Sequence, residues 1–358
     1  MMKKVSFNSV IVLVLLTLVP FVCEAEETTV KLDKILLKAV ERDNFSGSVL
    51  VARDDQILLE KGYGSADLYH GQIPNTEETR YLIGSNTKSF TALAILQLDE
   101  KELISLDDPV TEYIPNYANF DGVTIHHLLT NASGIPDYYS STFDFIRYWG
   151  YSKEPETILH RFKNSTLLFE PGSDYSYSNT NYLILAMIIE QVTGERYGKY
   201  LEKNIFKPLG LDDTGYQSEM ESIEGLAKGY LVKRIFTVDK LDLSNFLGSG
   251  CLYSNVGDLY QYIKALNQEQ LLEPTSMDKL FTPWAKRATG YYGYGWAIKG
   301  VDDQRLIYHT GLVPGFHSGL YNYIDEDIII IILSNNQESR INSLQMILYQ
   351  ALKQKSSK

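Results

Sequence analysis

Six consecutive aliphatic residues near the end of the chain, Ile328–Leu333, constrain the fold more than any other stretch. Successive side chains of a β-strand point to opposite faces of its sheet, so a strand with one face in water alternates apolar and polar residues. A strand that is apolar at every position is buried on both faces. Ile328–Leu333 therefore predicts a central strand in a sheet that is covered on both sides.

Further strand patterns lie at both ends of the 358-residue chain. Near the N-terminus, Phe45–Ala52 and Gln56–Tyr63 flank a short turn and predict a β-hairpin. Near the C-terminus, three more segments are rich in β-branched and aromatic residues: Tyr294–Ile298, Arg305–Tyr308 and Phe316–Ile324. Consecutive strands usually pair with one another, so we expect both ends to join in one antiparallel sheet.

The middle of the chain, from about residue 85 to residue 285, shows few strand patterns. Apolar residues at helical spacing predict helices at 28–43, 85–98, 125–130, 181–193, 257–266 and 341–353. These patterns predict an α+β fold, in which an antiparallel sheet built from both chain ends is flanked by helices and carries a mainly helical inserted region. We expect one domain over residues 26–358, with sheet regions at about 28–80 and 290–358, and a cleft between the sheet and the helical region at about 85–285.

Residues 1–25 have the pattern of a signal peptide. Two lysines precede an apolar stretch, Val10–Val22, which is too short to span a membrane comfortably. Cys23 and Ala25 are small residues at the two positions that a signal peptidase reads. Cleavage after Ala25 predicts a secreted or periplasmic chain with no stable membrane insertion. An uncleaved anchor and a lipid anchor on Cys23 are the alternatives.

Composition argues against several classes of partner and cofactor. The formal net charge is −12, which disfavours nucleic acid and anionic membrane surfaces as partners. Cleavage after Ala25 leaves Cys251 as the single cysteine, and the six histidines show no His-x-x-x-His spacing. The adjacent pair His126–His127 is better explained as part of the turn before Ser133. We therefore expect no disulfide, no metal site and no cofactor.

The first candidates for catalysis are Ser85 and Lys88, at the start of a predicted helix. Residues three apart on a helix share a face, so the hydroxyl and the amine should lie side by side. A serine becomes a strong nucleophile when a base takes its proton, and a lysine acts as that base when burial lowers its pKa. The spacing alone is weak evidence, because Ser276 and Lys279 repeat it and about one or two copies are expected by chance.

Two other segments carry candidate functional groups. Tyr177 and Asn179 place a phenol and an amide on one side of an expected loop, although Tyr117–Asn119 repeats the pattern. A phenol beside a lysine ammonium is expected to ionise more readily and to pass a proton. His309–Gly311 lies after one predicted strand and before the next, where a glycine lets a substrate backbone approach an edge strand. The N–H groups of that strand would face a developing oxyanion.

The three segments, in this order and at these separations, resemble the serine β-lactamase and penicillin-binding-protein superfamily. The match is closest to its class C-like branch, which includes D-amino-acid peptidases, carboxypeptidases and esterases. Three flanking segments are also similar to those of the family: Leu128–Ile135, Glu170–Gly172 and Gly248–Ser254. The resemblance covers about residues 30–350. Each motif alone is weak evidence for the resemblance, and the ordered set is strong evidence.

The resemblance implies a role for each matching residue. Ser85 would attack a carbonyl carbon and form an acyl-enzyme, which water then hydrolyses. Lys88 and Tyr177 would share the proton, and the assignment between them is open. The backbone N–H groups of Ser85 and Leu312 would form the oxyanion hole.

The remaining residues of the motifs would hold the substrate. Asn179 would bind the substrate amide and the lysine, and Thr310 and Gly311 would complete the substrate-binding strand. His309 stands where many members of the family have a lysine. A histidine has a reference pKa of about 6.5 and is only partly charged at neutral pH, so a permanent cation for an antibiotic carboxylate is absent. This departure fits peptidases and esterases better than a dedicated β-lactamase.

These inferences give one main hypothesis and two alternatives. The main hypothesis is a secreted serine hydrolase that acts through an acyl-enzyme on a peptide or ester, of the D-alanyl-D-alanine carboxypeptidase or D-peptidase type. Its partner would be a small peptide or ester substrate, with a cell-wall peptide or a β-lactam as examples. The first alternative is an esterase or a weak β-lactamase. The second is a catalytically silent relative that binds wall peptides or a protein.

Overall fold

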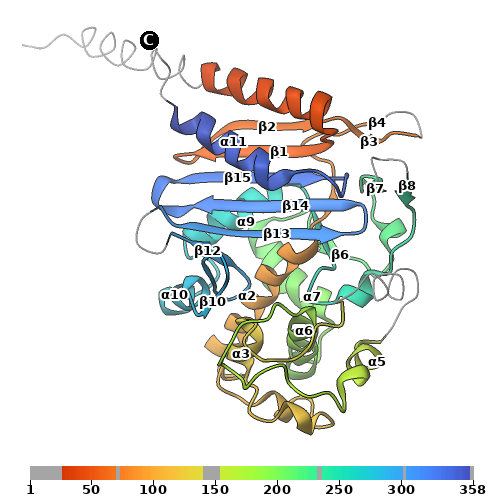
Figure 1. Cartoon of the computed structure of the whole chain (residues 1–358), viewed down its shortest axis with the longest axis vertical. Helices are drawn as coiled ribbons and strands as arrows, with labels where there is room; N and C mark the ends of the chain where they lie inside the picture. The colour runs from red at the N-terminus through yellow and green to blue at the C-terminus, as the bar shows by residue number, and fades with distance from the viewer. Residues whose placement is uncertain (1–25, 70–72, 140–153, 232–235, 301–303, 355–358) are drawn as a thin grey trace, which may run out of the picture.

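The computed structural model describes residues 26–69, 73–139, 154–231, 236–300 and 304–354 (Figure 1). The predicted signal peptide in residues 1–25 lies outside this part of the chain. Within the described ranges, none of the helices has the length and apolar character that crossing a membrane requires.

An antiparallel sheet of eight strands, in the order β10-β11-β12-β13-β14-β15-β1-β2, forms the framework (Figure 1). Its strands come from both ends of the chain: β1 (Gly47–Arg53), β2 (Gln56–Tyr63), β10 (Ala285–Lys286), β11 (Tyr291–Tyr292), β12 (Ala297–Lys299), β13 (Leu306–Val313), β14 (Phe316–Tyr323) and β15 (Ile328–Ser334). The predicted hairpin and the joining of the two ends in one sheet are both confirmed.

The strand β15 lies inside the sheet, between β14 and β1, and all of its residues are buried. Ile328, Ile330 and Ile332 pack in a core with the N-terminal helix, residues 26–43, and with α11 (Ile341–Lys353). Ile329, Ile331 and Leu333 belong to the main core on the other face. The central strand covered on both faces is therefore confirmed.

The segment between the two halves of the sheet is mainly helical. Its helices are α2 (Thr87–Glu100), α3 (Ile125–Leu129), α5 (Pro155–Leu159), α6 (Asn179–Thr193), α7 (Tyr197–Leu201), α8 (Lys207–Leu209), α9 (Val256–Asn267) and α10 (Pro274–Phe281). The strands described here are short: β5 (Tyr81–Leu82), β6 (Gly215–Tyr216), β7 (Gly229–Leu231), β8 (Phe236–Val238) and β9 (Leu252–Ser254). Near the N-terminal hairpin, β3 (Ser65–Asp67) pairs with β4 (Ile73–Pro74). The α+β class is confirmed.

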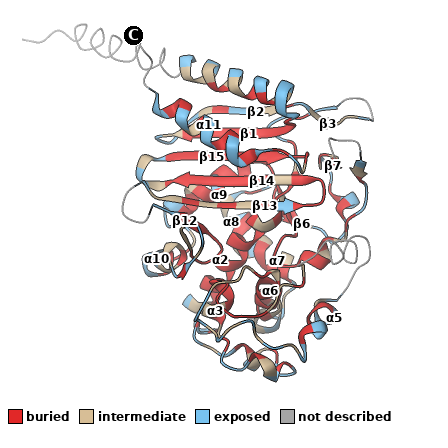
Figure 2. Ribbon diagram, viewed as in Figure 1, coloured by how far each residue is buried: buried red, intermediate tan, exposed pale blue. Residues whose placement is uncertain are grey.

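Two helices of this region form the interior of the molecule. Residues 87–98 of α2 are all buried, and so is most of α6, as the red ribbon in Figure 2 shows. The predicted apolar, buried helix after Ser85 is therefore confirmed, and it presents its N-terminal end to the sheet at β13.

Two predicted strand boundaries are wrong. Of the predicted strand Tyr294–Ile298, only Ala297 and Ile298 are in a strand, β12, because the chain turns before them and Gly295 has a left-handed backbone. The predicted strand Arg305–Tyr308 continues as β13 to Val313, which pairs with Phe316 across a tight turn. His309–Gly311 therefore lies within a strand and not between two strands.

Candidate active site

Ser85 lies in a single 3-10 turn, Gly84–Asn86, that connects β5 to α2. The helix proper begins two residues later than the sequence predicts, at Thr87. Gly84 has φ +51°, in the left-handed region that favours glycine, and this turn holds Ser85 partly exposed in front of the helix. Unpaired backbone N–H groups at a helix N-terminus favour negative charge, so the hydroxyl of Ser85 lies where an oxyanion would be stabilised.

Lys88 is completely buried one turn after Ser85. Its Nζ donates to Ser85 Oγ at 3.2 Å, to Asn179 Oδ1 at 2.7 Å and to the Ser249 carbonyl oxygen at 2.7 Å. Burial lowers the pKa of Lys88 to about 7, although the charge of Asp137 opposes this effect. An amine that loses its proton near neutral pH and touches a hydroxyl is suited to act as a general base.

Tyr177 and Asn179 both reach Lys88, but from different structures. Asn179 is the first residue of α6 and not part of the loop, whereas Tyr177 precedes the helix. The Tyr177 ring centre lies 4.8 Å from the Lys88 amine. Burial raises the pKa of the Tyr177 phenol above its ordinary value, and a hydrogen bond with Ser85 only partly offsets this. The expectation that the phenol ionises more readily is therefore wrong.

Asp137 adds a carboxylate to this group, and the sequence patterns did not identify it. Its Oδ1 accepts from the backbone N–H of Asn179 at 2.9 Å, and its Oδ2 accepts from Asn179 Nδ2 at 3.1 Å. The only signal in the sequence is its position in the turn after Ser133, two residues beyond the segment Leu128–Ile135 that resembles the family.

The strand β13 packs directly against the turn that carries Ser85. A Cβ on Gly311 would overlap the carbonyl oxygen of Ile83, and a Cβ on Gly84 would lie 2.9 Å from the backbone nitrogen of Leu312. Gly311 is thus required because β13 packs against the backbone of Ile83, and not because a substrate approaches it, as expected from the sequence. Pairing with β12 ends at Tyr308, so the rest of β13 has no strand partner on that side within the described chain. Leu312 is 55% exposed there.

His309 is buried and neutral. Its Nδ1 lies 2.8 Å from the Thr310 carbonyl oxygen, which only accepts, so Nδ1 carries the proton and Nε2 accepts from the Tyr292 hydroxyl at 3.1 Å. Burial and the nearby Lys88 amine lower the pKa of His309 to about 3. The expected partial charge at neutral pH is therefore wrong, and His309 supplies no cation.

Arg287, between β10 and β11, places a permanent cation near the site. The sequence patterns did not reveal this residue. Its guanidinium carbon lies 5.7 Å from the ring centres of both Tyr175 and Tyr292, and its charge is one of the influences on the pKa of His309. It forms no ion pair with a carboxylate of the described residues. Beside it, the buried Tyr175 hydroxyl has no hydrogen-bond partner in the described chain. Both groups line a cavity of about 730 Å³.

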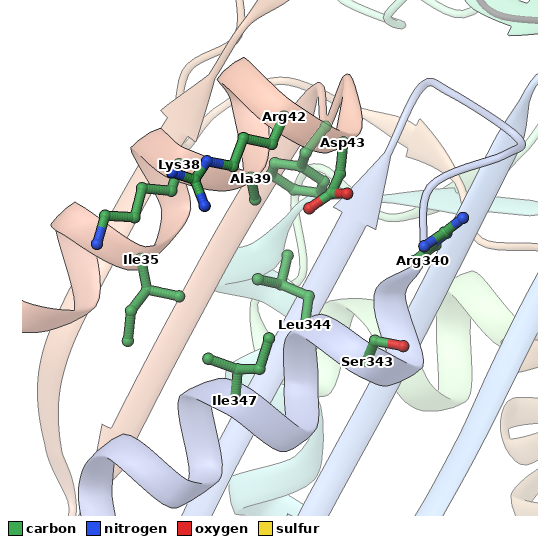
Figure 3. Close-up of a pocket in the computed structure, with 10 residues that line it drawn as sticks. Ile35, Lys38, Ala39, Arg42, Asp43, Arg340, Ser343, Leu344 and Ile347 are labelled. Carbon is green, nitrogen blue, oxygen red and sulfur yellow. The ribbon is translucent and has the colours of Figure 1, made fainter.

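Two alternative sites lack this chemistry. In the second Ser-x-x-Lys pair, Lys279 is half-exposed and forms a 3.0 Å salt bridge with Asp99, unlike the buried Lys88, which bonds the serine hydroxyl of its own pair. A groove of about 460 Å³ between the N-terminal helix and α11 is lined by alkyl groups and by the charged side chains seen in Figure 3. Its hydroxyl, on Ser343 of α11, and its lysine, Lys38 of the N-terminal helix, come from different helices, and no hydrogen bond joins them in the described chain.

Comparison with known proteins agrees with this arrangement. The family model described as Beta-lactamase matches residues 32–349. A penicillin-binding protein of Bacillus subtilis (strain 168) is 31% identical over 319 residues, which cover 83% of this chain and 70% of that protein.

Solved structures share the fold. The octameric penicillin-binding protein homologue from Pyrococcus abyssi superposes with a TM-score of 0.81 at 30% identity, over 90% of this chain and 77% of that one. The D-amino acid amidase from Ochrobactrum anthropi SV3, complexed with D-phenylalanine, has a TM-score of 0.81 at 23% identity, over 91% and 99% of the two chains, and shows likeness of fold alone. The chain therefore belongs to the β-lactamase family and is a serine hydrolase related to the penicillin-binding proteins.

Proposed function

We propose that this chain is a secreted peptidase of the D-alanyl-D-alanine carboxypeptidase or D-peptidase type, which acts through an acyl-enzyme on Ser85. The observation that carries the proposal is the buried amine of Lys88, 3.2 Å from Ser85 Oγ and with a pKa lowered to about 7. The relatives named penicillin-binding proteins support a substrate of this class.

In the proposed reaction, Ser85 Oγ attacks the carbonyl carbon of the scissile bond and its proton passes to Lys88 Nζ. The lysine amine is the better base of the two candidates, because its pKa is lowered while that of the Tyr177 phenol is raised. Tyr177 stays neutral and relays the proton from the ammonium to the leaving amine. Water then attacks the ester carbonyl and gives a proton to Lys88 Nζ, the ester C–O bond breaks as a proton passes to Ser85 Oγ, and the acyl product leaves as an acid.

The oxyanion of the tetrahedral intermediate is assigned to the backbone N–H groups of Ser85 and Leu312. The close packing of Gly84 against the Leu312 backbone nitrogen brings these two groups to one place. Because β13 lacks a strand partner beyond Tyr308 on the β12 side, its backbone is open to an extended substrate. Preorganised N–H donors of this kind typically lower the activation free energy by ~3 kcal/mol each.

Recognition of the terminal carboxylate is assigned to Arg287 together with Thr310. His309 is neutral and supplies only a hydrogen-bonding ring, whereas Arg287 keeps its charge at every relevant pH. The Tyr175 hydroxyl, buried beside Arg287 without a partner, offers a further donor to the same group. Asn179 has its amide oxygen on Lys88 and one amide N–H on Asp137, and its second amide N–H is assigned to the substrate amide.

One observation favours esterase activity as the second candidate function. The neutral His309 removes the lysine-type cation that an antibiotic carboxylate meets elsewhere in the family, and an ester without a carboxylate needs no such cation. A weak β-lactamase activity would follow from slow hydrolysis of a penicilloyl-enzyme by the same residues.

Intact-mass measurement tests the nucleophile first. The purified protein is treated separately with a fluorophosphonate and with benzylpenicillin, and any adduct is mapped by peptide sequencing. An adduct of each reagent on Ser85 supports the acyl-enzyme. Folded protein without an adduct from either reagent would contradict the proposal and favour the silent binding relative.

Substrate preference separates the peptidase from the esterase. We expect release of D-alanine from an acylated peptide ending in D-alanyl-D-alanine, and no release from the same peptide ending in L-alanine. Efficient hydrolysis of p-nitrophenyl esters without any peptidase activity would establish the esterase instead.

Secretion is tested by N-terminal sequencing of the protein recovered from the producing cell. A chain that begins at Glu26 supports cleavage after Ala25. A chain that retains residues 1–25 would contradict the signal peptide.

A further inference from the structure

Asp137 accepts hydrogen bonds on both carboxylate oxygens, and all of its described donors are N–H groups. The backbone N–H groups of Asn179 and Tyr139 donate to Oδ1 at 2.9 Å and 3.2 Å, and Asn179 Nδ2 donates to Oδ2 at 3.1 Å. An ionised carboxylate accepts only, whereas a protonated one needs an acceptor for its O–H. Burial raises the pKa of Asp137 above its ordinary value, whereas these three donors and the nearby Lys88 charge oppose that effect. The donor geometry therefore favours the ionised form of Asp137.

The contact with Asp137 fixes which end of the Asn179 amide faces Lys88. The oxygen and nitrogen of an asparagine amide are distinguished by their partners. Because the carboxylate requires the NH₂ end, the amide oxygen must point away from Asp137, and it lies 2.7 Å from Lys88 Nζ. The reversed amide would place donors against donors at Lys88 and oxygen against oxygen at Asp137.

We propose that Asp137 is a positioning residue of the reaction, which orients Asn179 and stabilises the ammonium that forms when Lys88 takes the proton of Ser85. The inference rests on the proposed function, in which Lys88 is the base. Asp137 then acts on the lysine through Asn179, much as the carboxylate of a Ser-His-Asp triad orients the histidine and stabilises its charged form.

The other titratable groups that face Lys88 carry no charge near neutral pH. They are Cys251 directly before β9, Tyr177 before α6, Tyr182 within α6 and His309 on β13. Burial raises the pKa of the Cys251 thiol to about 12, raises that of both phenols and lowers that of His309 to about 3. Asp137 is the acidic group whose charge opposes the loss of the Lys88 proton.

The test is the pH dependence of fluorophosphonate labelling in Asp137→Asn, which keeps the size of the side chain and removes its charge. The labelling rate should fall at low pH, where Lys88 becomes protonated, and this fall is the acid limb of the profile. Without the carboxylate, the ammonium form of Lys88 is less stable, so the midpoint of the acid limb should move to lower pH by roughly one unit. The plateau rate above this limb should fall roughly tenfold or more, because the ammonium that forms in the transition state loses its counter-charge.

Asp258→Asn is the matched control. Asp258 is also a buried carboxylate, which accepts from the Asp213 N–H and from Thr214 Oγ1, at 2.8 Å and 2.7 Å, at the start of α9. Its replacement should leave the acid limb unmoved. A merely structural role for Asp137 would lower the labelling rate without moving the limb, and that result, or equal shifts in both variants, would overturn the proposal.

Asn179→Ala keeps the inference testable if Asp137→Asn folds poorly. It removes the amide that joins Asp137 to Lys88 and leaves Asp137 its two backbone donors, the N–H groups of Tyr139 and of residue 179. The two replacements together should cost no more than the larger one alone, since coupled residues are non-additive. Additive losses would overturn the proposal, whereas wild-type protein that is not labelled on Ser85 would instead contradict the proposed function.

Discussion

The amine of Lys88 lies 3.2 Å from the hydroxyl oxygen of Ser85, and it reaches that oxygen from inside the protein while the serine remains partly exposed. One turn of chain thus presents a nucleophile to solvent and its base to the core. The low polarity of the core is what makes the amine available, because it disfavours the charged form.

Ser85→Ala is expected to lower kcat/KM by a factor of roughly 10⁴–10⁶ with little change in the thermal midpoint. The hydroxyl bonds Lys88 Nζ and the Tyr177 side chain, both of which belong to the site, so its loss should leave the fold intact. Hydrolysis assays and thermal unfolding check both parts.

Ser276→Ala is the control for this replacement, because Ser276 and Lys279 have the same spacing on α10. It should retain wild-type turnover. Normal activity in Ser85→Ala, or loss in the control, would show that the wrong serine has been identified.

The pH profile should report the lysine. Only neutral Lys88 accepts a proton, so kcat/KM should fall about tenfold per unit as pH decreases below about 7. Lys88→Arg should be inactive at every pH, because a guanidinium does not deprotonate. A profile that stays flat down to pH 5 would mean that Lys88 is not the base.

Lys88 should also make stability depend on pH. Its pKa is about 7 in the folded protein and about 10.5 when exposed, so the unfolded chain binds more protons between these values. The free energy of unfolding should therefore rise as pH increases from 7 towards 10, and the change should be smaller in Lys88→Met. Urea unfolding of both proteins at pH 7 and pH 9.5 measures this change. An equal change in the free energy of unfolding in the two proteins would contradict the prediction.

The sheet was predictable from sequence because burial on two faces leaves a direct mark in composition. Ile328–Leu333 has no polar position, and the other segments near the C-terminus are rich in β-branched and aromatic residues. The boundary of β13 was not predictable, because Gly311 is a residue disfavoured in strands and it interrupts the strand pattern. Its backbone is extended because it pairs residue by residue with β14 up to Val313.

The nucleophile and its base could be identified from spacing, since a helix turn brings them together locally. Asp137 and Arg287 could not, because each meets the site only through tertiary contacts: Asp137 through the first turn of α6 and Arg287 through the rings of Tyr175 and Tyr292. The charge of His309 was misjudged for the same reason, since burial is a property of the fold and not of the motif.

Arg287→Ala should raise KM selectively for substrates that end in a free carboxylate, with a loss of roughly 10- to 100-fold in kcat/KM. Esters and amide-capped peptides should be hydrolysed at nearly the wild-type rate. The neighbouring Lys286→Ala removes an exposed cation of β10 that lines the same cavity, and it should have a much smaller effect because an exposed charge is screened by water. Equal losses for capped and free substrates would show that Arg287 does not bind the carboxylate.

Gly311→Ala should damage both the fold and the site. The new methyl group would overlap the Ile83 carbonyl oxygen, and Ile83 directly precedes the turn that holds Ser85. Relief of such an overlap requires the backbone of β13 to shift, at a cost of about 1–3 kcal/mol. Because Leu312 follows Gly311, the same shift moves one of the two proposed oxyanion donors and should lower kcat more than it raises KM.

Gly257→Ala is the control, since the nearest atom to its new methyl group is the flexible end of Glu60, at 3.2 Å. A stable and fully active Gly311→Ala would mean that the position of β13 against the Ser85 turn is not needed for catalysis.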